Sequence, residues 1–429
     1  MTMWPLFLVV SLASGSVQTP ASQPTTPDEC VKAARAFTQT SQRAVERITA
    51  EVVRRINADK VDMARACAAQ FDPKTIDASQ IADLIALYGE ADQRDLATAT
   101  LTRALGLKSL AAPARAKVLA QAVLTGLSEP KSSERNARLE GYIDALDRVA
   151  GDELDPHILD SKISAHARMN GYYRGDDIDD GIIKQSTWLI ERAKAFTPEQ
   201  RRQYGSTIIS AHINMAEALA GRGQNNRANE LLREAKSSWG DIPNAARMID
   251  PNIARYALIG TPAAPIAAQR WLNAPANTRL AMTGAVTLLE FTAHWCGPCK
   301  ESYPGVKRLL ATYGDQGFRV VLSTELYGYF GAERPLTAEA EFERDREYFA
   351  EEGLNVPVAV GNQRPPSVRG ADGTYTYFKD PNMAAYEVGG IPQLHLIDKQ
   401  GRIRLIMVGY DDVNEPFVAA QIEKLLKEK

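Results

Sequence analysis

The chain has 429 residues, of which 45% are hydrophobic and 24% are charged, and its formal net charge is -3 at pH 7. A chain of this length is too long for one ordinary domain, so two or three domains are expected. The balanced charge argues against a dedicated nucleic-acid-binding protein, because no basic excess is available to neutralise phosphates.

The first 27 residues are interpreted as a signal peptide followed by a linker. An apolar run at residues 4–13 ends in small residues, and a proline-containing linker follows at residues 20–27. The run is too short to cross a bilayer comfortably as a permanent helix. The sequence therefore predicts a periplasmic or otherwise extracytoplasmic protein with no stable membrane span after signal removal. A short uncleaved anchor is the alternative, since no Lys or Arg precedes the apolar run.

Residues 28–259 are predicted to form an all-α domain. This stretch is rich in Ala, Leu, Arg and Glu, and its apolar residues are spaced three and four apart, which is typical of amphipathic helices. The clearest predicted helices cover residues 81–88, 96–105, 136–149 and 182–195.

Residues 214–236 resemble a tetratricopeptide repeat. Ala216 would let the partner helix approach, Gly223 would open the turn, and Ala228 and Ala235 would seat the second helix. The sequence thus predicts a tetratricopeptide-like array of helical hairpins, which commonly offers a concave docking surface. A helical spacer that binds no partner is the alternative.

From residue 260 to residue 429 the pattern changes to alternating strands and helices, punctuated by Pro and Gly. Residues 398–401 have the chemistry of a hairpin turn. The predicted strands cover residues 286–292, 318–323, 356–360, 393–397 and 402–408. The predicted helices begin at the cysteine motif and cover residues 337–352 and 415–427. An α/β domain is therefore expected here.

The chemistry of this second domain is expected at Cys296 and Cys299. Cys296 would lie at the amino end of a helix, where free N–H groups and the helix dipole favour a nucleophilic thiolate. Cys299, one turn later, would be the resolving thiol, with Gly297 and Pro298 setting the stiffness of the active-site loop. A zinc site would need further ligands, and the sequence offers no companion cluster. We therefore expect no metal and no cofactor besides a redox-active disulfide.

The other two cysteines, Cys30 and Cys67, lie in sequence predicted to be helical. In an oxidising compartment they could form a structural disulfide between neighbouring helices. Two buried free thiols are the alternative, and the sequence leaves both open.

Two motifs in the second domain resemble the thioredoxin superfamily. Residues 290–300 read Glu-Phe-Thr-Ala-His-Trp-Cys-Gly-Pro-Cys-Lys, and residues 389–393 read Gly-Gly-Ile-Pro-Gln. The layout from about residue 265 to the end is most similar to the TlpA-like (redoxin) branch of exported reductases. Ser302 stands where many members of that branch carry a Glu.

The resemblance implies roles for four further residues. Pro392 would be a cis-proline, Ile391 would offer backbone hydrogen bonds to a client, and Trp295 would belong to the docking surface. Glu290 would be a buried acid that exchanges a proton with Cys299, with its pKa raised by desolvation. A carboxylate facing solvent is the alternative for Glu290.

His294 is expected to be exposed; the alternative is an imidazolium that stabilises the neighbouring thiolate and raises the oxidising power.

Together these features predict an exported thiol:disulfide oxidoreductase that reduces disulfide-bearing client proteins. Reducing power outside the cytoplasm must be resupplied, so a membrane electron donor is implied. The sequence does not decide between reduction, oxidation and isomerisation. The alternative function is a helical protein-docking scaffold with an accessory or sensory redox domain.

Overall fold

The computed structural model describes residues 24–44, 50–130, 132–175, 179–365, 368–369, 375–376, 378–410 and 414–428. The predicted signal peptide lies outside the described residues, since it falls within residues 1–23. Among the described residues, no helix is both long and apolar enough to cross a membrane. The chain divides into two compact units, and the boundary between them in the sequence falls between Lys162 and Ile163.

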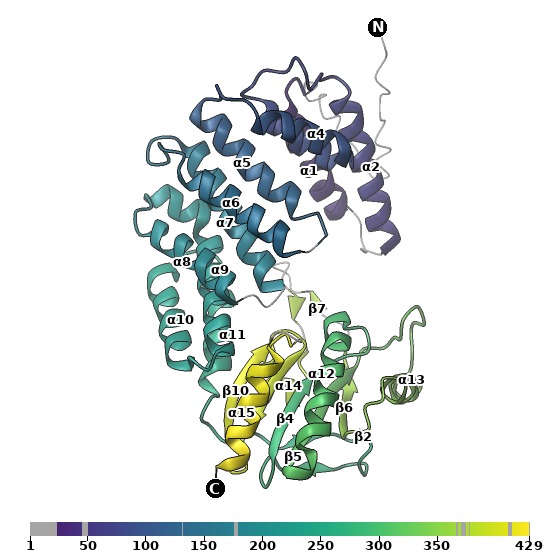
Figure 1. Cartoon of the computed structure of the whole chain (residues 1–429). Coiled ribbons are helices and arrows are strands. Elements are labelled where there is room, and N and C mark those ends of the chain that lie inside the picture. The colour runs from purple at the N-terminus through teal and green to yellow at the C-terminus, as the bar shows by residue number, and fades with distance from the viewer. Residues whose placement is uncertain are drawn as a thin grey trace. The chain divides into compact units, whose positions relative to one another are not determined.

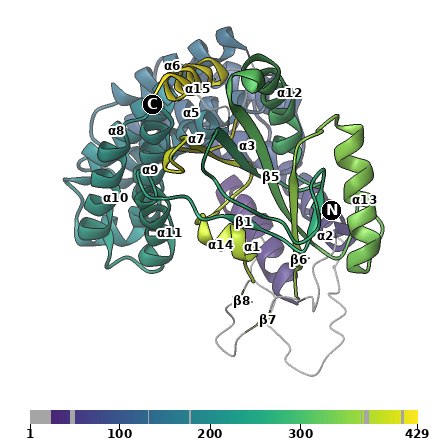
Figure 2. The same ribbon diagram turned by 90° about the horizontal axis from the view of Figure 1, so that it is seen from below.

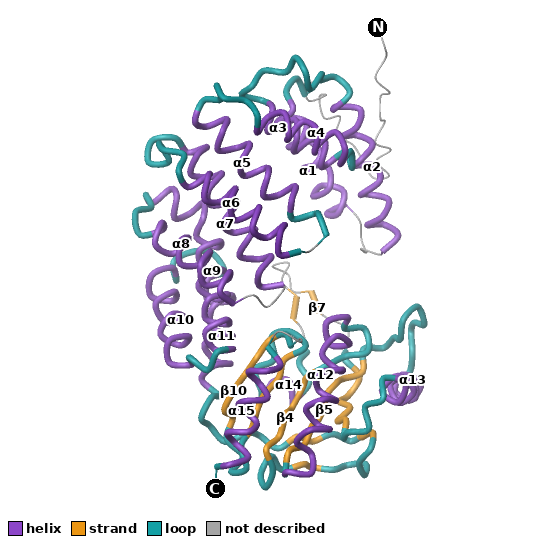
Figure 3. The backbone as a smooth tube through the Cα atoms, in the orientation of Figure 1, coloured by secondary structure: helices purple, strands orange, loops and turns teal. Residues whose placement is uncertain are grey.

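The first unit is helical, as the sequence predicts (Figures 1 and 3). Its helices are α1 (Pro27–Ala44), α2 (Ala50–Ala68), α3 (Ile81–Glu90), α4 (Arg94–Leu105), α5 (Ala112–Gly126), α6 (Ser133–Asp147) and the start of α7 (Pro156–Gly175). Cys30 of α1 and Cys67 of α2 form a disulfide with a Cα–Cα distance of 6.1 Å. The structure thus favours the disulfide over two free thiols.

The second unit begins with more helices: α8 (Asp179–Ala193), α9 (Pro198–Gly221), α10 (Asn225–Trp239) and α11 (Ala245–Ala257). The predicted hairpin is formed by α9 and α10. Ala216, Ala228 and Ala235 are fully buried, and Gly223 adopts a φ of 72° in the turn, where glycine meets no steric penalty. The assignment of this hairpin to the tetratricopeptide class stays a prediction.

A mixed sheet forms the centre of the second unit, in the order β10-β9-β4-β5-β6-β2. Its strands are β2 (Arg270–Leu272), β4 (Val286–Phe291), β5 (Phe318–Leu326), β6 (Val358–Gln363), β9 (Gln393–Ile397) and β10 (Ile403–Val408). β4, β5 and β6 are parallel, whereas β9, β10 and β2 join them in antiparallel pairs. The predicted strands are all present, but the short edge strand β2 was not foreseen.

The remaining elements connect or cover this sheet. They are the short strands β1 (Ile266–Ala267), β3 (Arg279–Leu280), β7 (Val368–Arg369) and β8 (Tyr375–Thr376), the helices α12 (Gly297–Tyr313), α13 (Ala338–Glu351), α14 (Pro381–Ala385) and α15 (Glu415–Lys427), and a 3-10 turn at Gly314–Gln316. Figure 1 shows α12 and α15 on the near side of the sheet.

Side chains of β4 alternate between the two faces of the sheet and define two cores. On one face, Val286 and Leu288 pack in a core that includes residues of α12 and α15. On the other face, Leu289 and Phe291 lie in a core that includes residues of α9, α10 and α11. Helices that precede residue 260 therefore bury one face of the α/β sheet.

The change from helices to strands falls between α11 and β1, where the sequence predicts it. The compact unit that contains the sheet begins earlier, at Ile163. A boundary between two independent domains at residues 259 and 260 stays a proposal.

Candidate functional site

The site is organised by the chain that leaves β4 and enters α12. Cys296 is the residue immediately before α12, and it forms a disulfide with Cys299 at a Cα–Cα distance of 5.2 Å. Its Sγ accepts the backbone N–H of Cys299 at 3.2 Å, and Pro298 lies in the first turn, where no donor is lost. This position favours negative charge on the Cys296 sulfur once the disulfide is reduced.

Glu290 lies on β4 and is fully buried, which excludes the alternative of a carboxylate facing solvent. It alternates with Leu288 and therefore points to the sheet face that carries α12. Burial raises the pKa of Glu290 to about 8, although a hydrogen bond from Ser302 partly opposes this rise. The side chain is therefore mostly protonated at neutral pH.

Ser302 connects this acid to the cysteine helix. Its Oγ lies 2.8 Å from Glu290 Oε1 and 2.7 Å from the backbone oxygen of Cys299. A hydroxyl has one hydrogen to donate. When Glu290 is protonated, the acid can donate to Ser302, which donates to the Cys299 carbonyl. When Glu290 is ionised, Ser302 donates to the carboxylate instead.

Trp295 supplies apolar surface next to the nucleophile. Its side chain is 47% exposed, and its ring packs edge-on against Tyr327 at a centroid distance of 5.3 Å. Because large apolar side chains are normally buried, an exposed Trp held in place by a neighbour suits the docking of a partner.

His294 does not lie where the sequence predicts. Its side chain is only 2% exposed, and Nδ1 lies 3.3 Å from Asp345 Oδ1 on α13. The rings of Tyr327, Tyr329 and Phe330 surround the imidazole at centroid distances of 5.8, 5.5 and 4.7 Å. The expectation of an exposed His294 is wrong, because the chain between β5 and α13 covers it.

Asp345 was not identified from the sequence. The carboxylate is 1% exposed, and burial raises the pKa of Asp345 above its usual value, although the nearby His294 opposes part of this rise. Asp345 lies within a charged amphipathic helix, and nothing in its immediate sequence distinguishes it from solvated acids of the same helix. Asp345 could be identified from the sequence only if the buried face of α13 were already known.

The proline loop, residues 386–392 between α14 and β9, is placed by the register of β9 on β4. The Ile391–Pro392 peptide bond is cis, as expected. Gln393, the first residue of β9, pairs with Phe291, the last residue of β4. Pro392 therefore lies at the same end of the strands as the chain that leads from β4 to Cys296.

Side chains inside the loop close it on itself. Gln393 Oε1 accepts the backbone N–H of Gly389 at 3.2 Å, and its Nε2 donates to the carbonyl of Tyr386 at 3.2 Å. The same Nε2 lies 2.9 Å from Nε2 of His395. Burial, with a smaller contribution from Arg255, lowers the pKa of His395 to about 3, so this ring is neutral.

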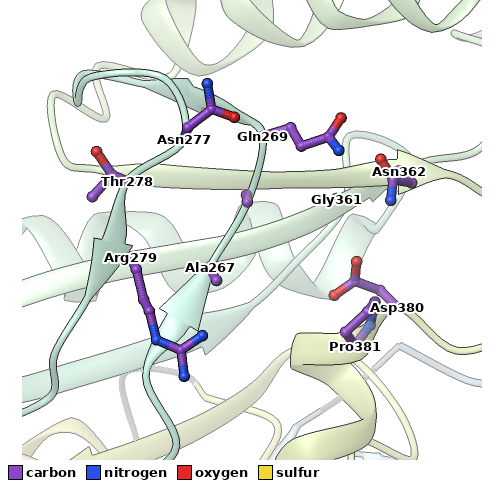
Figure 4. Close-up of a pocket in the computed structure, with 10 residues that line it drawn as sticks. Ala267, Gln269, Asn277, Thr278, Arg279, Gly361, Asn362, Asp380 and Pro381 are labelled. Atoms are coloured by element: carbon purple, nitrogen blue, oxygen red, sulfur yellow. The ribbon is translucent and has the colours of Figure 1, made fainter.

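A surface pocket lies between the paired strands β1 and β3, the end of β6 and the start of α14 (Figure 4). Its polar lining includes Gln269, Arg279, Asn362 and Asp380. The Asp380 carboxylate caps α14 by accepting the N–H of Asn382 at 2.8 Å. No residue predicted from the sequence to act in catalysis or binding lines this pocket, so we assign it no part in the redox site.

A disulfide at the amino end of a helix follows a central parallel strand, and a cis-proline loop leads into the neighbouring antiparallel strand. These features define a thioredoxin-like domain, and the predicted fold class of helices plus a thioredoxin-like α/β domain is confirmed.

Two curated relatives are similar to part of this chain. They are the thiol-disulfide oxidoreductases ResA of Geobacillus kaustophilus (strain HTA426) and Geobacillus thermodenitrificans (strain NG80-2). Each is 28% identical over 126 residues, which is 29% of this chain and 56% of the relative. The chain thus spans about half the length of the curated relatives it matches. No family model matches the chain.

Solved structures are also similar to this part of the chain. A thioredoxin-like superfamily protein is 25% identical, with a TM-score of 0.30, over 39% of this chain and 97% of its own. A thiol:disulfide interchange protein from Chlorobium tepidum is 18% identical, with a TM-score of 0.28, over 39% of this chain and 97% of its own.

Proposed function

We propose that the protein is a thiol:disulfide oxidoreductase that reduces disulfides of client proteins through Cys296 and Cys299. The observation that carries the proposal is the disulfide between these residues at the amino end of α12. Two further observations support the proposal: the buried acid Glu290 on β4, the strand that precedes α12, and the cis-proline loop at the same end of the strands.

The reaction proceeds by two thiol–disulfide exchanges. The Cys296 thiolate attacks one sulfur of the client disulfide, which forms a mixed disulfide and releases one client thiolate. Cys299 then loses its proton and attacks the Cys296 sulfur. This step releases the second client thiolate and forms the Cys296–Cys299 disulfide. The client gains two electrons, and the dithiol loses two.

Glu290 is the group proposed to take the proton from Cys299. Its pKa of about 8 lies close to the ordinary thiol pKa of about 8.5, so the proton can move between them at little cost. Glu290 Oε2 is buried, and no described residue hydrogen-bonds it. In the ionised fraction of Glu290, which grows as pH rises toward 8, this oxygen is therefore free to accept a proton while Oε1 accepts the Ser302 hydroxyl.

Client docking is assigned to the surface around the nucleophile. The exposed Trp295 would cover one side of an extended client segment. The backbone of Ile391, next to Pro392, would offer it hydrogen bonds. Export to an extracytoplasmic compartment and resupply of electrons by a membrane donor remain parts of this proposal.

The test is the reduction potential of the purified protein in glutathione and dithiothreitol buffers, with Cys296→Ser as the control. A value near roughly −270 mV, that of thioredoxin, supports a reductant. A value near roughly −120 mV reverses the direction of the reaction. Absence of a reversible couple contradicts the proposal.

A further inference from the structure

The helical part of the second unit reaches the proline loop through α11. Tyr256 of α11 shares a buried core with Phe291 of β4 and Tyr386 of the loop. Figure 2 shows α11 near β1 and α14, the elements that flank this core. A side chain from the helices can therefore act on the loop that holds Pro392.

Arg255, the residue before Tyr256, makes this contact. Its side chain is buried, and its Nε donates to the backbone carbonyl of Glu387 at 3.3 Å. Its Nη1 donates to Asn252 Oδ1 at 3.1 Å, which holds the guanidinium against its own helix. Among the described residues, no carboxylate forms an ion pair with it. A buried guanidinium needs hydrogen-bond acceptors, and the loop carbonyl supplies one.

Gly389 shows how closely the guanidinium approaches the loop. A Cβ built on Gly389 would overlap Nη2 of Arg255. Any side chain at this position would displace either the guanidinium or the loop. Gly389 lies two residues before Ile391, so a displacement here would reach the backbone that is proposed to dock the client.

We infer that Arg255 is a positioning residue that holds the cis-proline loop in its client-binding conformation from the helical side of the sheet. This inference rests on the proposed function. The Gln393 side chain hydrogen-bonds two backbone groups within the loop, and Arg255 of α11 hydrogen-bonds the Glu387 carbonyl of the same loop. Without the guanidinium, the Glu387 carbonyl loses its donor and space opens beside Gly389. Cys296 precedes α12 and Cys299 lies in its first turn, and this helix packs on the other face of the sheet. We therefore expect the potential of the cysteine pair to change little without Arg255.

The test uses the full-length protein and two probes. Insulin is the protein disulfide, with dithiothreitol as reductant. The small disulfide is 5,5′-dithiobis(2-nitrobenzoate), mixed in a single turnover with protein that has been reduced beforehand and freed of dithiothreitol, because dithiothreitol would itself reduce this probe. We expect Arg255→Met to raise the KM for insulin roughly tenfold, as expected for a lost hydrogen bond to a charged group. The kcat, the rate with the small disulfide and the equilibrium constant of the cysteine couple with glutathione should each stay within about twofold of the wild type.

Arg319→Met is the matched control. Arg319 donates to Thr287 Oγ1 at 2.8 Å and to the Ala281 carbonyl at 2.7 Å, at the end of the sheet opposite the cysteines. Its replacement removes comparable hydrogen bonds and should leave the KM for insulin unchanged. An equal rise in KM in the two variants would overturn the positioning role, because it would reflect general loss of structure.

A double-mutant cycle tests the contact itself. Gly389→Ala should raise the KM for insulin in the wild type, but it should have little further effect in an Arg255→Ala background, where the new methyl group has room. Additive effects, or a KM that Arg255→Met leaves unchanged, would overturn the inference alone. A wild type that reduces neither probe would overturn the proposed function as well.

Discussion

The Ser302 hydroxyl lies 2.8 Å from a carboxylate oxygen of Glu290, and this contact joins the acid of β4 to the cysteine helix. Ser302 occupies the position at which the TlpA-like branch often carries an acid of its own. In this chain the acid comes from the strand, and the helix contributes only the hydroxyl. Under the proposed function, control of the Cys299 proton would therefore be divided between β4 and α12.

Glu290→Gln should slow the second exchange. The amide cannot accept the Cys299 proton, so release of the client from the mixed disulfide should fall by roughly one hundredfold at pH 7. Stopped-flow measurement of single-turnover reduction resolves this step from the first attack by Cys296. Glu301→Gln, a change at an exposed neighbouring acid, is the control and should behave as the wild type. Equal rates in all three proteins would remove Glu290 from the mechanism.

The same substitution should change how stability depends on pH. The pKa of Glu290 is about 8 in the folded protein and 4.5 as the ordinary value. The folded state therefore binds more protons between these values, and wild-type stability falls as pH rises through this window. Relative to the wild type, Glu290→Gln should gain up to roughly 1.4 kcal/mol for each pH unit. Denaturant unfolding from pH 4.5 to 9 measures this, and parallel curves would contradict it.

Ser302→Ala should move the pH dependence of activity upward. The hydroxyl lowers the pKa of Glu290, so its loss should raise that pKa by about one unit, the effect of one hydrogen bond to a charged group. The rise in the rate of the second exchange with pH should shift by the same amount. Ser302→Thr keeps the hydroxyl and is the control. A pH profile that does not move in Ser302→Ala would show that the contact with Glu290 has no effect on proton transfer.

His294 and Asp345 should be energetically coupled. Each is buried, and removing one partner leaves the other as an unpaired polar group. His294→Asn and Asp345→Asn should each destabilise the protein by roughly 3 kcal/mol, and the double variant should cost less than their sum by at least about 1 kcal/mol. Asp380→Asn is the control, because Asp380 is a buried acid that accepts the backbone N–H of Asn382 at 2.8 Å; its effect should add to that of His294→Asn. Additive free energies of unfolding for His294 and Asp345 would show that they act independently.

The sequence predicts placement where the signal is local. The cysteine pair at the start of a helix, the acid buried within an apolar strand and the cis-proline before β9 lie where local sequence predicts them, while their roles stay predictions. Prediction from the sequence failed where a partner lies far along the chain. Asp345 and Arg255 each lie in an amphipathic helix, and the helical period shows that one face is buried but not what covers it. The edge strand β2 has three residues, which is too short for alternation to show.

The contact of α9, α10 and α11 with the sheet limits where the chain can be divided into stable fragments. A fragment of residues 260–429 keeps every residue of the redox site but loses α9, α10 and α11. It would thus expose the face of the sheet that carries Phe291, Val321 and Ile406, all fully buried in the whole chain. Exposed apolar surface on this scale leads to aggregation.

We expect this fragment to be insoluble or to bind the dye 8-anilinonaphthalene-1-sulfonate, which reports exposed apolar surface. A fragment of residues 156–429, which starts at the beginning of α7, should remain soluble and keep the potential of the intact protein. A stable, cooperatively unfolding 260–429 fragment would instead establish two independent domains that meet at residue 260. The helices α9, α10 and α11 would then be attached to the redox domain without being needed for its fold.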